Sequence, residues 1–118
     1  MNLPPIHPHG IQNLNRDTIG RDFLLDLKNH PKCSTFSESD WSMISTAIYL
    51  AKTIHRNDKR HDERPYIVHP LEVTENLIAH QDKLTVTDIC VALLHDTLED
   101  HPAYWRILYH RMGIDIFR

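Results

Sequence analysis

The sequence has little of what marks several common classes of protein. Its 118 residues include only two cysteines, Cys33 and Cys90, far apart and in no CxxC pair, so neither a disulfide scaffold nor a zinc knuckle is expected. No apolar run approaches the length of a membrane span, and the amino terminus lacks the order of a secretory signal. A formal net charge of −3 argues against a nucleic-acid or membrane-surface partner. We therefore expect one small cytoplasmic domain.

Helical periodicity runs through most of the chain, whereas no long segment alternates with period two. This pattern predicts an all-α fold class, a compact orthogonal helical bundle. We assign residues 1–36 to an N-terminal arm with a short helix and residues 37–118 to the main domain. The expected helices cover residues 21–28, 37–54, 71–80, 87–100 and 103–112.

The stretch Ile89–Asp100, ICVALLHDTLED, organises the chain. It begins with an unbroken apolar run, which predicts a buried helix that Thr87 caps. Its other end gathers an imidazole and three carboxylates, at His95, Asp96, Glu99 and Asp100. Carboxylates at a helix C-terminus repel one another and the helix dipole. A metal ion would compensate them, although a solvated last turn is the simpler interpretation of a bare His-Asp pair.

A second stretch, PYIVHP, covers residues 65–70. Pro70 suits the first position of a helix, where its missing N–H costs nothing. His69 would then stand at the helix entrance, where the positive end of the dipole favours the neutral imidazole that binds metals. A lone histidine beside a proline is more often a capping or loop residue, so this motif alone decides nothing.

PYIVHP, followed by HD and, after two more residues, by ED, resembles the HD phosphohydrolase domain of the RelA/SpoT family, the (p)ppGpp hydrolases. The resemblance covers residues 38 to 117, roughly. It implies a metal site of His69, His95 and Asp96 that binds Mn²⁺ or another first-row divalent ion. It also implies that Glu99 and Asp100 orient a water molecule and move protons. The implied reaction is hydrolysis of the 3′-pyrophosphate of ppGpp or pppGpp, which degrades the alarmone of the stringent response.

The highly charged stretch Arg56–Arg64 is either solvated surface or part of a nucleotide-binding site. Lined up with the family, Arg60 falls on the arginine that stacks on guanine, and His61 stands where the family usually has a basic residue. The family's Ser-Gly-Glu turn is replaced by Asp62-Glu63-Arg64. The resemblance thus implies a guanine nucleotide as partner and leaves other nucleotides open. It makes the nearby His55 a packing or supporting residue.

The family's fourth metal ligand is an aspartate on a later helix, in a pattern like LADKLxN that these residues do not contain. Asp115 is the one carboxylate after the ED pair, and it lies outside any such motif. We therefore expect that the protein continues past Arg118, that a partner supplies the ligand, or that the domain binds without catalysis. We also expect part of the run 89–94 and the face of Trp105 and Leu108 to lack partners, so that the chain self-associates or is marginally stable.

Overall fold

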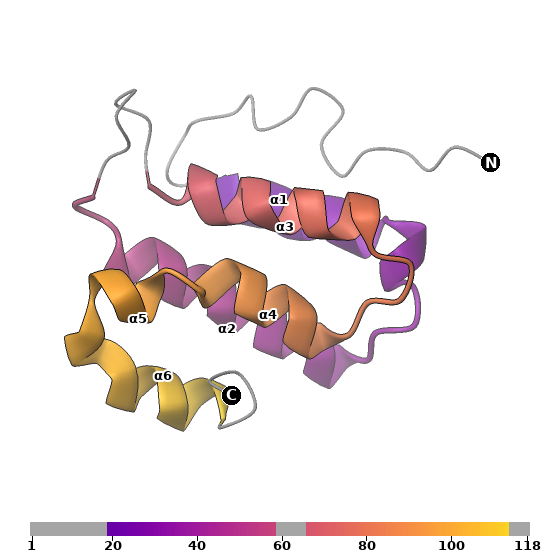
Figure 1. The fold of residues 1–118 in the computed structure, drawn as a ribbon. Helices are drawn as coiled ribbons and strands as arrows, with labels where there is room; N and C mark the ends of the chain where they lie inside the picture. The colour runs from indigo at the N-terminus through magenta and orange to yellow at the C-terminus, as the bar shows by residue number, and fades with distance from the viewer. Residues whose placement is uncertain (1–18, 59–65, 114–118) are drawn as a thin grey trace.

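The computed structural model describes residues 19–58 and 66–113, and these residues form helices and turns without any strand (Figure 1). The predicted all-α fold is therefore confirmed for this part of the chain. In order, the elements are α1 (Ile19–Lys28), the 3₁₀ turn η1 (Pro31–Cys33), α2 (Glu38–Ile54), α3 (Val68–His80), α4 (Val86–Leu94), α5 (Thr97–Asp100), the 3₁₀ turn η2 (Pro102–Tyr104) and α6 (Trp105–Met112).

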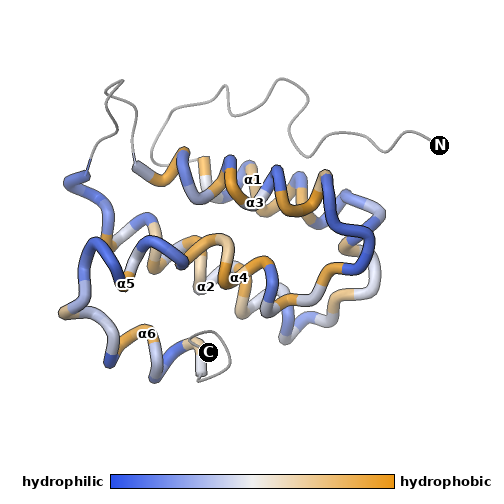
Figure 2. The backbone as a smooth tube through the Cα atoms, viewed as in Figure 1, coloured by the Kyte–Doolittle hydropathy of each residue, from blue (hydrophilic) through white to orange (hydrophobic). Residues whose placement is uncertain are grey.

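The long helix α2 lies at the centre of the bundle. It packs against α4, α1 and α6, and α4 packs in turn against α3. Figure 2 shows that α4 is hydrophobic along most of its length and that the chain becomes hydrophilic at α5. None of the helices in the described ranges is both long and apolar enough to span a membrane. The hydrophobic part of α4 thus gives way to polar residues at the start of α5, where the candidate site lies.

The apolar run of residues 89–94 lies in this core, as predicted, with only Val91 exposed. Leu108 is fully buried, so the expectation that it would lack partners is wrong, whereas the exposed Val91 agrees with the expectation for part of the run. Trp105 differs from Leu108, because 52% of Trp105 is exposed. Self-association remains a prediction.

The ends of α4 differ from the expectation in two ways. Thr85, rather than Thr87, caps the helix, and its side chain and that of Asp88 form a reciprocal capping box. The helix also ends at Leu94 instead of running to Asp100. Just past this end, Nδ1 of His95 lies 2.9 Å from the carbonyl oxygen of Ala92, one of the carbonyls that the last turn of the helix leaves available.

The start of α3 also lies earlier than predicted. The helix begins at Val68, so that Pro70 is its third residue and His69 its second. Proline fits there because the N–H groups of the whole first turn lack partners within the helix. His69 is consequently held on regular helical backbone.

Helix α1 contributes Ile19, Phe23 and Leu27 to the same core as the other helices. It approaches α2 closely at Gly20, where an added Cβ would lie 2.8 Å from Cγ2 of Ile48. The contact leaves no room for a side chain at this position. The division at residues 36 and 37 stays a prediction.

Candidate metal site and its surroundings

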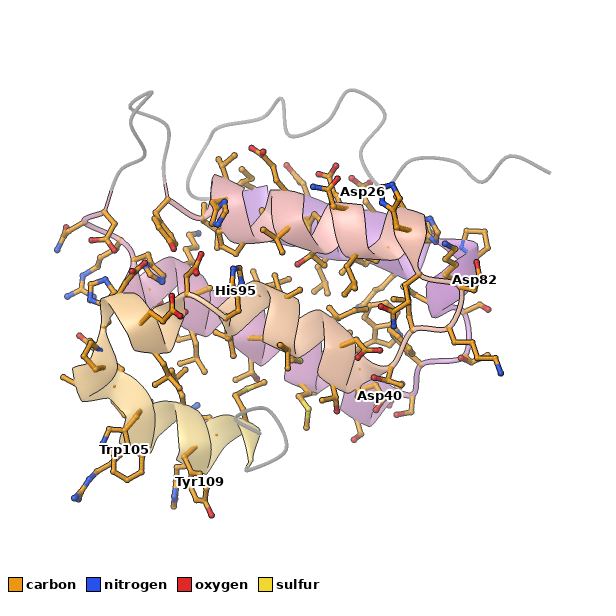
Figure 3. The ribbon with its side chains drawn as sticks, in the orientation of Figure 1. Asp26, Asp40, Asp82, His95, Trp105 and Tyr109 are labelled. Atoms are coloured by element: carbon orange, nitrogen blue, oxygen red, sulfur yellow. The ribbon has the colours of Figure 1, made fainter. Side chains whose placement is uncertain are left out.

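The first group of candidate ligands comes from the end of one helix and the start of another. His69 lies in the first turn of α3, His95 follows the last residue of α4, and Asp96 precedes α5. Because α3 packs on α4, these positions meet although they lie far apart in sequence. Figure 3 shows the His95 side chain at the α5 end of α4, pointing towards α3.

One oxygen of Asp96 lies between the two imidazoles of this group. Oδ2 of Asp96 is 2.9 Å from Nε2 of His69 and 3.2 Å from Nε2 of His95. The ligand atoms of the three residues all lie within 4.8 Å of one another. The side chains are 25% to 38% exposed, so the group is open to solvent.

The backbone determines which nitrogen of His95 carries the proton. Nδ1 of His95 lies 2.9 Å from the carbonyl oxygen of Ala92. Since a carbonyl only accepts, Nδ1 must donate, and the neutral ring then has an unprotonated Nε2. That nitrogen faces Asp96. A histidine held in this way presents a lone pair to the centre of the group, as metal-binding histidines do.

Tyr66 connects this group to the acidic end of α5. Its hydroxyl donates to Oδ2 of Asp100 at 3.0 Å and to Oδ2 of Asp96 at 3.3 Å. Its ring stacks on His55, with the centroids 3.8 Å apart. Burial, and then the bond to Asp100, raise the pKa of Tyr66, so the phenol remains a donor.

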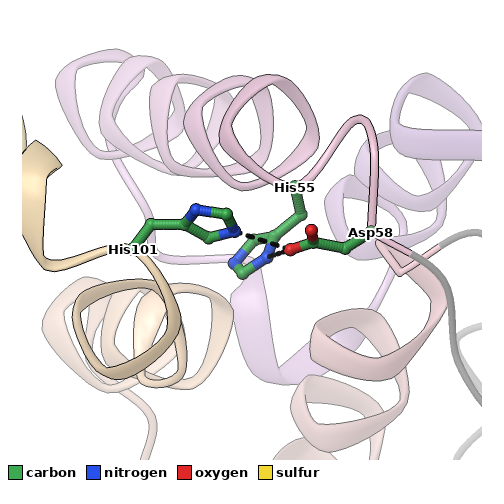
Figure 4. Close-up of side chains that lie close together, drawn as sticks. All are labelled: His55, Asp58 and His101. Carbon is green, nitrogen blue, oxygen red and sulfur yellow. Dashed lines mark hydrogen bonds and ion pairs between the residues drawn. The ribbon is translucent and has the colours of Figure 1, made fainter.

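A second group, which includes the His55 ring stacked on Tyr66, consists of His55, Asp58 and His101 (Figure 4). Oδ2 of Asp58 is 2.8 Å from Nδ1 of His55 and 2.6 Å from Nε2 of His101. The hydroxyl of Thr97 lies 3.2 Å from the remaining nitrogen of His55. His55 is only 2% exposed, so both of its ring nitrogens are satisfied inside the protein.

Burial and hydrogen bonding set the charges in the second group. Desolvation lowers the pKa of His55, because burial disfavours the charged imidazole. The hydrogen bond from His101 lowers the pKa of Asp58 and keeps this carboxyl ionised. A neutral His55 therefore donates from Nδ1 to Asp58 and accepts from the Thr97 hydroxyl at Nε2.

Both groups offer the same donor set, two imidazole nitrogens and a carboxylate oxygen. Such nitrogen and oxygen donors suit first-row divalent ions. The residues that the structure describes therefore fit the kind of ion that the sequence predicted.

The structure brings together some of the predicted site residues and not others. His69, His95 and Asp96 meet, and Asp100 joins them through Tyr66. Glu99 is exposed and forms no side-chain hydrogen bond with any described residue. The predicted nucleotide-binding residues, Arg60 and His61, lie outside the described residues, as does Asp115.

Sequence reasoning missed Asp58, Thr97 and His101 and gave Tyr66 no role. Tyr66 stood within PYIVHP, one helical turn before His69. Asp58 and His101 are 43 positions apart, and no periodicity relates them. The prediction that His55 is a packing or supporting residue agrees with its burial and its stacking on Tyr66.

In the described part of the chain, these features define a helical bundle with two His/His/Asp groups that could hold metal ions. No protein-family model matches the chain, and no solved structure matches it. It is similar to the guanosine-3′,5′-bis(diphosphate) 3′-pyrophosphohydrolases of Aquifex aeolicus (39% identity over 70 residues) and Xenopus tropicalis (35% over 81). It is also similar to the bifunctional (p)ppGpp synthase/hydrolase RelA of Mycobacterium tuberculosis, with 38% identity over 65 residues.

These matches take in 59%, 66% and 55% of this chain, respectively. They span 10% of the Aquifex protein, 45% of the Xenopus protein and 8% of the Mycobacterium protein. Over this segment the chain is similar to proteins of the RelA/SpoT family, and the resemblance inferred from the sequence is confirmed.

Proposed function

We propose that this chain hydrolyses the 3′-pyrophosphate of ppGpp or pppGpp, giving GDP or GTP and pyrophosphate. His69, His95 and Asp96 would hold Mn²⁺ or another first-row divalent ion. The observation that carries the proposal is the Asp96 oxygen 2.9 Å and 3.2 Å from the two imidazole nitrogens. When bound, the ion would polarise a phosphate oxygen and lower the pKa of a water molecule. Relatives named for this hydrolysis support the choice of substrate.

The two acidic residues of α5 have different surroundings and would have different roles. Asp100 accepts the Tyr66 hydroxyl with Oδ2, and its other oxygen would orient the attacking water. Glu99 is exposed and would take the proton from that water. General acid–base work of this kind contributes roughly 10²- to 10⁴-fold in rate. Arg60 and His61 would hold the nucleotide, Arg60 by stacking on the base.

A second candidate function is binding of the guanine nucleotide without turnover. One observation favours it: within residues 19–58 and 66–113, only three side chains gather at the first group. Three protein ligands hold an ion less tightly than four, so the ion would be lost more readily and turnover with it. The two candidates share the metal and the nucleotide and differ in the chemical step.

Mn²⁺-dependent release of pyrophosphate from ppGpp tests the proposal, with Glu99→Gln as the diagnostic variant. Gln is nearly isosteric with Glu but accepts no proton, so this variant should keep nucleotide affinity while kcat falls at least a hundredfold. Asp82→Asn, an exposed change in the turn before α4, is the matched control. Arg60→Ala should instead raise KM.

Three outcomes separate the candidates. Full turnover in Glu99→Gln would remove Glu99 from the mechanism. Tight ppGpp binding by the wild type without pyrophosphate release would establish the binding function. Release of phosphate or pyrophosphate from a different nucleotide, with ppGpp inert, would reassign the substrate.

A further inference from the structure

We infer that His55, Asp58 and His101 form a second metal site, separate from the first group and suited to a zinc-like ion. No part of the proposed hydrolysis uses these residues. They converge from the turn after α2 and from the residue that follows α5. The ligand atoms of the three residues all lie within 4.8 Å of one another.

The geometry of the group is close to what such an ion needs. Nδ1 of His55 and Nε2 of His101 lie 2.8 Å and 2.6 Å from the same Asp58 oxygen. In a tetrahedral zinc site, bonds of about 2.0–2.2 Å place the donor atoms roughly 3.3 Å apart. The group therefore has to open by about half an ångström. Asp58 and His101 can move in this way because their side chains are 32% and 28% exposed.

The surroundings of His55 already resemble the support that a metal-binding histidine receives. Its ring is buried, stacked on Tyr66, and bonded at Nε2 to Thr97. Binding through Nδ1 moves the ring proton to Nε2, where the Thr97 hydroxyl can accept it as readily as it now donates. The partner of the second nitrogen thus serves both tautomers, and no proton has to leave the protein.

The exposed sides of Asp58 and His101 give the ion a path to the group and leave a fourth position for water. The alternative is a purely structural link, in which Asp58 ties the two imidazoles together by hydrogen bonds alone. In the absence of metal, the structural link and the metal site predict the same contacts. When metal is added, the structural link predicts that no ion binds to the group.

Cobalt binding to the full, untagged chain separates the two possibilities, because Co²⁺ replaces zinc-like ions and absorbs visible light when bound by imidazole. We expect His101→Gln to bind one equivalent fewer than the wild type. His110→Gln, an exposed histidine on α6, is the matched control and should lose none. Asp58→Asn should weaken the same equivalent at least tenfold. Far-UV circular dichroism checks that each variant is folded.

The test does not depend on hydrolysis or on the first group. If the first group binds no ion, the wild type and every variant bind one equivalent of Co²⁺ fewer. The difference between His101→Gln and His110→Gln persists. Equal binding by these two variants would overturn the second site. A measurement on the unaltered chain gives the same decision: Zn²⁺ should shift the ring NMR signals of His55 and His101, and unchanged signals at saturation would establish the structural link.

Discussion

The two His/His/Asp groups have nearly the same internal geometry and differ most in the burial of one histidine. In each, one carboxylate oxygen lies about 3 Å from two imidazole nitrogens. The first group is open, with His69 and His95 each about a third exposed, and an acidic pair follows it in the chain. The second group is built on His55, which is almost fully buried.

The difference in solvent exposure between the two groups indicates what each set of ligands can accommodate. Under the proposed function, the open first group would admit a phosphorylated substrate and a reactive water. The second group presents only Asp58 and His101 to solvent, because His55 is buried and stacked on Tyr66. The same kinds of donor atom would therefore serve catalysis in one place and ion binding or structural support in the other.

The strongest way to break the comparison is to remove the carboxylate of the first group alone. Asp96→Ala should lower Mn²⁺ affinity about a hundredfold, or about 2.7 kcal/mol, because it removes a ligand and the only charge between two imidazoles. Calorimetry or EPR measures this affinity. Asp82→Ala is the control, and equal affinities in the two variants would show that Asp96 is not a ligand.

A smaller effect should come from the support of the second group. Thr97→Val keeps the shape of a side chain that is 1% exposed but leaves Nε2 of His55 without a partner. An unsatisfied buried nitrogen costs about 1–3 kcal/mol in the free energy of unfolding, measured with urea in metal-free buffer. Thr46→Val, whose exposed hydroxyl bonds a backbone carbonyl, should cost much less. If the two variants are equally stable, the Thr97 contact contributes nothing.

Tyr66→Phe sharpens the comparison because it separates the ring from the hydroxyl. The stacked ring on His55 remains, while Asp96 and Asp100 lose a shared donor. Loss of a supporting hydrogen bond should weaken Mn²⁺ binding at the first group about tenfold. The number of Co²⁺ equivalents should stay the same. If Tyr66→Phe bound one equivalent of Co²⁺ fewer than the wild type, the phenol hydroxyl would be shown to support both groups.

The smallest expected effect is on the pH dependence of stability, and it comes from Glu75, which belongs to neither group. Burial, together with Glu72 and Asp26, raises the pKa of Glu75 on α3 to about 7, and Oε1 of Glu75 has no hydrogen-bond partner. An acid with a raised folded-state pKa favours folding when protonated, so the wild type should lose stability as the pH rises from about 4.5 to 7. Glu75→Gln should therefore raise the melting temperature at pH 8 and change it little at pH 4. A similar gain at both values would exclude the titration of Glu75 as the cause.

The sequence was sufficient for the helices and for the first group. Apolar periodicity, which depends on local order along the chain, identified the buried run of residues 89–94. The residues of the first group were indicated by the family resemblance, because His69 meets His95 and Asp96 only through the packing of α3 on α4. The break after Leu94 was not predicted, because the apolar and polar periodicity of residues 89–100 continues across it and only the backbone of the folded chain shows it. The second group escaped prediction because it depends on how α2 and α5 pack.

The position of Tyr66 has a consequence for how the two groups behave together. Its ring rests on a residue of one group, and its hydroxyl binds a residue of the other. An ion that displaces His55 therefore acts on the same side chain as an ion that displaces Asp96. Thermodynamic linkage makes any such influence reciprocal: the factor by which the first ion changes the affinity for the second equals the factor in the reverse direction. A single phenol would in this way make the occupancy of each group depend on the concentration of the other group's ion.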